Sequence, residues 1–136
     1  MTTHWHEQYL GKPWSHNPDP PNSFNCGELL RWIYKEFFGA NVPVVLADTG
    51  DLRSCIKDIR AIDRYWRFER VETPQDFDMA IMARGGEADH VGICVGSDIL
   101  HCRPKVGVFL DDVFTLQNMG WKSIKYIRPL GLVRIA

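Results

Sequence analysis

The sequence lacks an excess of charge of either sign. Its 136 residues hold 16 Lys and Arg against 17 Asp and Glu, for a formal net charge of −1. A protein that binds nucleic acid through the phosphates needs a basic stripe or patch, and this chain offers none. We therefore expect no nucleic-acid partner.

Long apolar runs are also missing. None approaches the roughly 20 residues that a helix needs to cross a bilayer, so we expect no membrane insertion. The opening MTTHWHEQYLG has neither the basic segment nor the apolar segment of a secretory signal. We therefore expect the protein to be made in the cytoplasm and to stay there unless another system carries it out.

No Cys-x-x-Cys pair occurs among the four cysteines, which are Cys26, Cys55, Cys94 and Cys102. Zinc and redox motifs of that type need this spacing, so neither is indicated, and without an export signal we expect reduced thiols. The sequence also shows no internal repeat and no linker long enough to separate domains. We expect one domain over residues 1–136.

The order of the expected elements predicts the fold class. A short helix is expected over 3–11 and a strongly amphipathic one over 26–38, ended by Gly39, with a more polar helix over 51–66. Short runs with a period of two follow, at 66–71, 78–83, 90–96, 98–102, 106–110 and 123–129. Helices followed by clustered strands indicate an α+β fold, with N-terminal helices packed on a small antiparallel sheet.

Cys26 lies at the start of the amphipathic helix. With Asn25 as N-cap, Cys26 is the first helical residue and Glu28 the third, a variant of the capping box. The positive end of the helix dipole lowers the pKa of a thiol, and backbone N–H groups there can stabilise an oxyanion. Cys26 also leans toward the apolar face, so a purely structural role is the competing interpretation.

Two histidines are placed to meet on one hairpin. A two-residue type II′ turn at residues 96–97 pairs Val95 with Asp98. This register puts His101 on the same face as His90 and diagonally across from it. Gly92 leaves room between the two rings. A cysteine nucleophile needs a base, and the base needs a group that orients it, so Cys26, His90 and His101 together suggest such a site.

Two segments resemble a known family. Residues 9–43, YLGKPWSHNPDPPNSFNCGELLRWIYKEFFGANVP, and 78–102, DMAIMARGGEADHVGICVGSDILHC, are similar to the cysteine and histidine blocks of NlpC-like cysteine peptidases. The similarity is greatest to the compact forms encoded in phage tail gene clusters. SIKYIRP, residues 123–129, resembles the closing strand of that family.

The resemblance implies a papain-like core with a Cys-His-His triad, in which Cys26 attacks, His90 is general base and acid, and His101 orients His90. It implies hydrolysis of peptidoglycan stem peptides through a thioester, usually between γ-D-glutamate and a diamino acid, with no metal or organic cofactor. The implied partners are the peptidoglycan peptide and phage tail proteins, and the implied location is a virion tail that meets the host cell wall.

Several positions depart from the family pattern. Asn25 stands where Asp is common, Gly27 and Glu28 replace the usual residues after the cysteine, and Trp14 replaces a frequent Tyr. Glu28 brings a negative charge toward the thiol, which opposes ionisation unless the side chain is turned away. These departures keep open a second interpretation, in which the protein is a tail assembly component that retains the peptidase fold and acts by binding.

A zinc site is the other alternative. His90, Cys94, His101 and Cys102 supply suitable ligand types. His101 and Cys102 are adjacent on one expected strand, however, and adjacent strand residues point to opposite faces. This alternation disfavours a shared metal ion.

Overall fold

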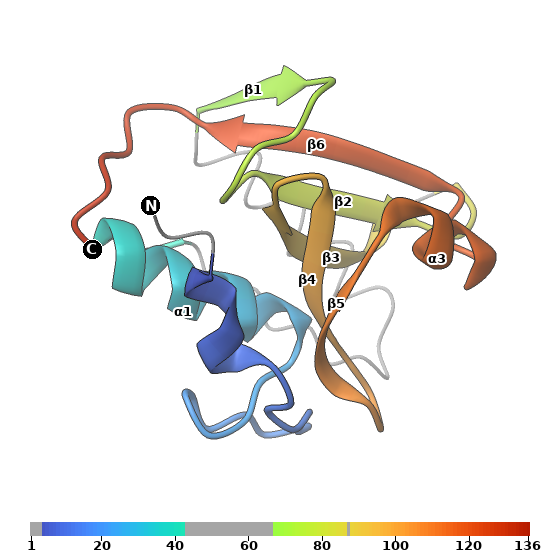
Figure 1. The fold of residues 1–136 in the computed structure, drawn as a ribbon, viewed down its shortest axis with the longest axis horizontal. Coiled ribbons are helices and arrows are strands. Elements are labelled where there is room, and N and C mark those ends of the chain that lie inside the picture. Colours follow the sequence, from blue (N-terminus) through green and yellow to red (C-terminus); the bar gives the residue numbers. More distant parts are fainter. Residues whose placement is uncertain (1–3, 43–66, 87) are drawn as a thin grey trace.

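The computed structural model describes residues 4–42, 67–86 and 88–136, and its main feature is one six-stranded sheet (Figure 1). The strand order is β1-β6-β2-β3-β4-β5, and every neighbouring pair is antiparallel. The strands are β1 (Phe68–Val71), β2 (Met79–Ala83), β3 (Ala88–Val95), β4 (Asp98–Arg103), β5 (Gly107–Asp111) and β6 (Ser123–Pro129). An antiparallel sheet that follows the main helix confirms the α+β prediction.

The helices differ in part from expectation. The helix α1 (Cys26–Phe38) has the predicted bounds, and it contacts β3 and β4. The first expected helix is instead a 3-10 helix, η1 (Trp5–Tyr9), so the expectation of several N-terminal α-helices on the sheet was wrong for this segment. A short helix, α3 (Val113–Asn118), was not predicted. The helix expected over 51–66 lies outside the described residues.

Tertiary contacts explain the 3-10 form of η1. The Trp5 ring stacks on Phe77 at 4.3 Å, and the Trp5 indole N–H donates to Asp76 at 3.3 Å. Directly after η1, the Gly11 amide donates to the Val108 carbonyl at 2.9 Å, which draws the chain to β5. A segment of five residues held at both ends cannot extend into a longer α-helix.

The sheet separates two apolar clusters, because successive strand residues point to opposite faces. The first cluster joins the apolar face of α1 to one face of β2, β3 and β4, and includes Cys26, Leu29, Leu30, Ile33, Met79, Val91, Ile93, Leu100 and Cys102. The second lies on the other face, beneath α3, and comprises Ala80, Met82, Cys94, Ile99, Leu116 and Trp121. Both faces of the central strands are therefore buried.

The hairpin between β3 and β4 has the predicted register. Val95 pairs with Asp98, and Cys94 pairs with Ile99. A type II′ turn requires a positive φ at its first central residue but not at its second. Gly96, the first, has φ +60°, and Ser97, the second, does not have a positive φ. The Gly96 amide also donates to Asp76 at 2.6 Å, which anchors the turn.

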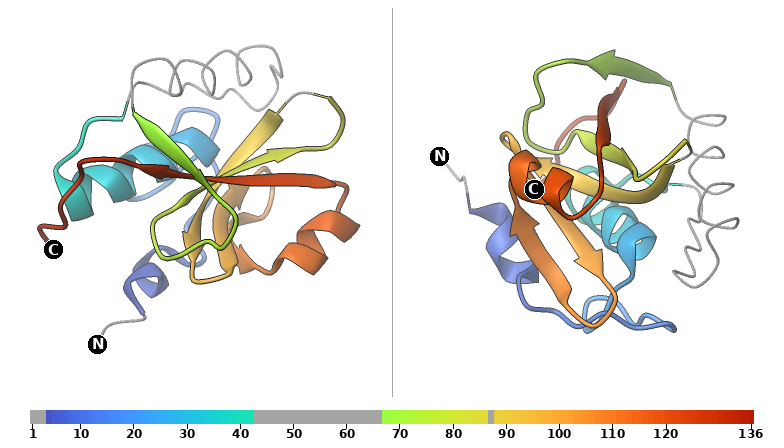
Figure 2. Two further views of the ribbon diagram at one scale, coloured as in Figure 1. Left: turned by 90° about the horizontal axis from the view of Figure 1, so that it is seen from above. Right: turned by 90° about the vertical axis from the view of Figure 1, so that its right-hand side faces the viewer.

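The C-terminal residues return from β6 to the C-terminal end of α1, as Figure 1 and the left view of Figure 2 show. The Ile135 amide donates to the Phe37 carbonyl at 2.8 Å. This bond uses a carbonyl in the last turn of α1, where carbonyls lack intrahelical donors. In the described part of the chain, no helix is long and apolar enough to span a membrane.

The N-cap of α1 leads to a first prediction. The Asn25 side-chain oxygen accepts from the Glu28 amide at 2.8 Å, and Asn25 is 4% exposed. Asn25→Ala removes this acceptor, so we expect the free energy of unfolding to fall by about 1 kcal/mol. Urea denaturation measures the change. Asn25→Asp is the matched control, because it keeps a capping oxygen, and an equal loss in both variants would contradict the cap assignment.

Candidate active site

His90 and His101 come together on the hairpin. Nε2 of His90 lies 3.0 Å from Nδ1 of His101, within hydrogen-bond distance. The two rings are nearly perpendicular, at 81°. The residues are 4% and 1% exposed, so the contact is shielded from water. The structure thus confirms the predicted approach of the two imidazoles.

Gly92 makes this approach possible. A Cβ atom at position 92 would lie 2.5 Å from Cγ2 of Ile99, 2.9 Å from the Leu100 carbonyl oxygen and 3.3 Å from Cβ of His101. The first two separations are shorter than van der Waals contact. Only glycine lets β3 and β4 pack this closely beside the two rings.

Trp121 fixes the plane of the His90 ring. The two rings stack with centroids 4.7 Å apart and an angle of 14°. The Trp121 indole N–H donates to Asp89 Oδ1 at 2.9 Å, and the Arg84 guanidinium packs over the indole at 4.1 Å. Because Asp89 precedes His90 in β3, the indole is tied to the strand that it covers. No sequence pattern predicted this contact of Trp121 with His90.

Asp111, the last residue of β5, is a second residue that the sequence analysis missed. Its Oδ2 lies 2.7 Å from Nε2 of His101. Asp111 pairs with Ile99, so it lies diagonally across from His101 on the same face of the sheet. The expected strand ended one residue earlier, at position 110, and the pairing of this strand with β4 was not considered. That pairing was the signal that would have found Asp111.

Burial keeps both imidazoles neutral. Desolvation is the largest cause that lowers the pKa of His90, to about 4, with Asp89 opposing and Arg84 and Arg103 adding to the effect. Desolvation and the neighbouring His90 lower the pKa of His101 to about 4, against the opposing hydrogen bond and charge of Asp111. Both rings are therefore unprotonated at pH 7, the form in which an imidazole accepts a proton.

Cys26 is the first residue of α1 and is 1% exposed. The Cys102 thiol donates to the Phe24 carbonyl at 3.4 Å, which holds the chain before α1 against β4. Cys26 packs in the first cluster, whereas His90 and His101 pack against Trp121 of the second. A contact between the Cys26 thiol and His90 therefore stays a prediction.

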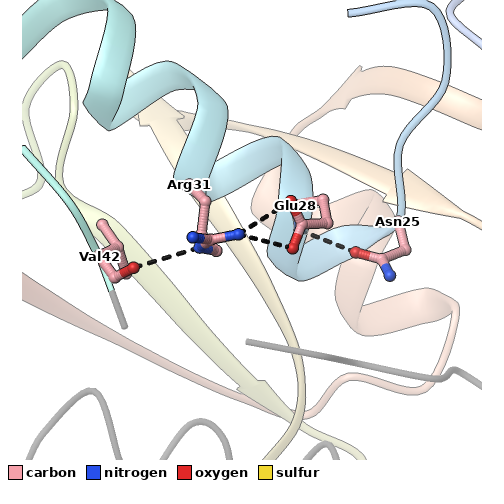
Figure 3. Close-up of polar contacts among 4 residues, drawn as sticks. All are labelled: Asn25, Glu28, Arg31 and Val42. Atoms are coloured by element: carbon pink, nitrogen blue, oxygen red, sulfur yellow. Dashed lines mark hydrogen bonds and ion pairs between the residues drawn. The ribbon is translucent and has the colours of Figure 1, made fainter. Parts of the chain in front are cut away.

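The first turn of α1 directs the Glu28 charge onto an arginine (Figure 3). Its two carboxylate oxygens accept from Nη1 of Arg31 at 3.0 and 3.2 Å. Nε of Arg31 donates to the Val42 carbonyl at 3.2 Å, which holds the guanidinium in place. The negative charge that the sequence placed near Cys26 thus has its own cationic partner.

The remaining described thiols are held in unreactive settings. Burial raises the pKa of Cys102 to about 12, and raises that of Cys94 further. Cys102 lies in the first cluster and His101 packs against the second, so the two residues face opposite sides of the strand. Among the described residues, no group of three or more His, Cys, Asp or Glu side chains is arranged to hold a metal ion.

The close packing at Gly92 leads to a second prediction. We expect Gly92→Ala to lower the free energy of unfolding by about 1–3 kcal/mol, because the added methyl group forces β3 and β4 apart. Thermal or urea denaturation measures this. The control is Gly85→Ala, since a Cβ at position 85 meets nothing within 4 Å. Equal stability of the Gly92 variant and the parent would contradict the packing argument.

The buried imidazoles lead to a third prediction. Because the folded pKa values lie near 4 and the ordinary pKa of histidine is about 6.5, the unfolded chain binds protons first as the pH falls. We expect the free energy of unfolding to fall between about pH 6.5 and pH 4, by up to about 1.4 kcal/mol per pH unit for each ring. Urea denaturation at several pH values measures this slope.

The free energy of unfolding should change less steeply with pH in His101→Gln, because this variant lacks one of the two buried rings. His4→Gln is the control, because the His4 side chain is 72% exposed. A His101 variant with the same slope as the parent would show that the ring does not stay neutral in the folded protein.

Comparison with known proteins gives a similar solved fold but no matching sequence family. No protein-family model matches the sequence, and no curated protein sequence matches it. Among solved structures, the chain is similar to the NlpC/p60 domain of the peptidoglycan hydrolase SagA, with a TM-score of 0.58 and 18% sequence identity. The match covers 88% of this chain and 90% of that domain. The protein therefore has a fold similar to an NlpC/p60 domain.

Proposed function

We propose that the protein is a cysteine peptidase that hydrolyses an amide bond in the peptides of bacterial peptidoglycan. The observation that carries the proposal is the buried His90–His101 pair, 3.0 Å apart on the β3–β4 hairpin, whose other face contacts α1. The neighbouring solved fold, that of a peptidoglycan hydrolase domain, supports the substrate class. The sequence resemblance described above supports the choice of Cys26 as nucleophile.

The contact with His101 engages Nε2 of His90, so Nδ1 is the nitrogen that acts in the reaction. In the first step the Cys26 sulfur attacks the amide carbon, a C–S bond forms, and the thiol proton passes to Nδ1. Collapse of the tetrahedral intermediate then breaks the C–N bond, and Nδ1 returns the proton to the departing amine. The product of this half-reaction is a thioester on Cys26.

The second half-reaction uses water. Nδ1 of His90 takes a proton from the water, and the water oxygen bonds to the thioester carbon. The C–S bond then breaks and releases the carboxylic acid. Nδ1 of His90 gives the proton it took from the water to the departing Cys26 sulfur, which restores the starting state. The Cys26 amide N–H, at the positive end of the α1 dipole, stabilises the oxyanion of both tetrahedral intermediates.

The finer assignment rests on the sequence motifs. The scissile bond is proposed to join γ-D-glutamate to a diamino acid. The protein is proposed to be carried by a phage or prophage tail, which delivers it to the host cell wall. Tail proteins would then be its assembly partners.

The fourth prediction concerns Cys26. We expect Cys26→Ala to abolish release of peptide fragments from defined muropeptides, as measured by product masses, while the circular dichroism spectrum is unchanged. Cys94→Ala is the control, because Cys94 is a buried thiol of the second cluster and takes no part in the proposed reaction. Undiminished hydrolysis by Cys26→Ala would falsify the mechanism.

Alkylation tests the site without a substrate. Iodoacetamide at neutral pH should modify Cys26 faster than Cys94 and Cys102, whose thiols are held protonated by burial. Peptide mapping identifies the modified residue, and His90→Ala should remove the excess rate. If all thiols label equally slowly and the parent binds muropeptides without cleaving them, the alternative is supported, in which the protein keeps the peptidase fold and acts by binding.

A further inference from the structure

Asp111 makes a contact that the proposed reaction has not yet used. Its Oδ2 lies 2.7 Å from Nε2 of His101, whose side chain is fully buried, while the Asp111 side chain is 20% exposed. The three side chains of Asp111, His101 and His90 thus form a continuous hydrogen-bonded series across β5, β4 and β3. Each imidazole in this series touches its neighbours through defined nitrogen atoms.

The chemistry of these atoms assigns the protons. An ionised carboxylate accepts hydrogen bonds and has no proton to donate, so Nε2 of His101 must carry hydrogen. A neutral imidazole carries only one N–H, so Nδ1 of His101 is an acceptor. The partner of that acceptor, Nε2 of His90, must then be the donor. In neutral His90, the unprotonated nitrogen is consequently Nδ1.

We propose that Asp111 is a positioning residue that fixes the Nε2–H tautomer of His101 and, through it, the Nε2–H tautomer of His90. This inference rests on the proposed function only in assigning the use of Nδ1, which is the atom that takes the proton from Cys26. When Nδ1 gains that proton, Nε2 of His90 still carries its own and still donates to His101. The series therefore needs no rearrangement during the reaction.

Loss of the carboxylate removes this constraint. In Asp111→Ala, Nε2 of His101 has lost its acceptor, and the ring can place its hydrogen on Nδ1 instead. Nδ1–H of His101 then donates to Nε2 of His90, which moves the hydrogen of His90 to Nδ1. That tautomer of His90 cannot accept a proton from the thiol at Nδ1.

Among the contacts of the described residues, the other groups around the rings do not supply the missing acceptor. Asp89 accepts from the Trp121 indole N–H and pairs with Arg84 at 3.6 Å. Arg103, on β4 with His101, and Arg84 are cations and cannot accept a hydrogen bond. Trp121 faces both rings with its aromatic system. In the described contacts, Asp111 is therefore the side chain whose hydrogen bond sets the tautomer of His101.

Histidine nitrogen NMR tests the inference. Long-range ¹H–¹⁵N correlation spectra of ¹⁵N-histidine-labelled protein at pH 7 report which nitrogen carries hydrogen. We expect Nε2–H for His90 and His101 in the parent, and a mixed or Nδ1–H population of both rings in Asp111→Ala. Asp111→Glu, which restores a carboxylate, should return the Nε2–H signals at least in part.

Asp111→Asn and Asp112→Asn form the matched pair for charge. Each removes one negative charge, but Asp112 is exposed and accepts from the Thr115 amide at 2.7 Å rather than from an imidazole. Asp112→Asn should leave the His90 and His101 signals unchanged. Asp111→Asn also keeps the side-chain volume, so it serves where Asp111→Ala fails to fold, and it should broaden or mix the tautomers because an amide can donate or accept.

Activity supplies the second readout. On muropeptides we expect Asp111→Ala to lower kcat by roughly 10- to 100-fold with KM within about twofold, since part of the general-base contribution is lost. Retention of Nε2–H by both rings in folded Asp111→Ala and Asp111→Asn would overturn the inference. If the parent cleaves no muropeptide, the proposed function fails, and the NMR result still decides the role of Asp111.

Discussion

The contact between His90 and His101 depends on the register of a single hairpin. Val95 pairs with Asp98 around a two-residue turn, and this pairing sets the face on which His101 lies. Because strand residues alternate, a shift of one position would send the His101 ring into the first cluster, away from His90. The turn is held from outside the hairpin as well, since the Gly96 amide donates to Asp76. The register is therefore specified by the turn residues, by a distant carboxylate and by burial on both faces of the sheet.

Burial of two imidazoles has a cost that the surrounding groups offset. A buried polar group needs hydrogen-bond partners, and His101 has one on each side, from His90 and Asp111. Stacking on Trp121 adds contact area for His90 and excludes water from the pair. The indole is held in turn through Asp89 and Arg84. The rings are thus fixed in position and neutral, the form in which an imidazole can accept a proton.

The sequence predicted the local features of this arrangement and missed the distant ones. The helix cap at Asn25, the end of α1 at Gly39 and the turn at Gly96 are encoded within a few residues, and the structure confirms each. Asp111 and Trp121 depend on strand pairing and on the position of α3, a helix of six residues too short to leave a clear periodic pattern. The 3-10 form of η1 depends on contacts with Phe77 and β5, which no local pattern contains.

The departures of α1 from the family pattern change less than their charges suggest. Asn25 caps the helix as the more common Asp would, because a neutral amide oxygen accepts from the Glu28 amide equally well. It does so without adding a negative charge beside Cys26. The charge that Glu28 adds is directed to Arg31, whose own position is held by the Val42 carbonyl. The positive end of the helix dipole lies at the start of α1, and it favours a thiolate. The same neutral cap and paired carboxylate would serve a protein that binds and does not cleave, so the proposed reaction depends on the thiol reaching Nδ1 of His90 and not on the cap.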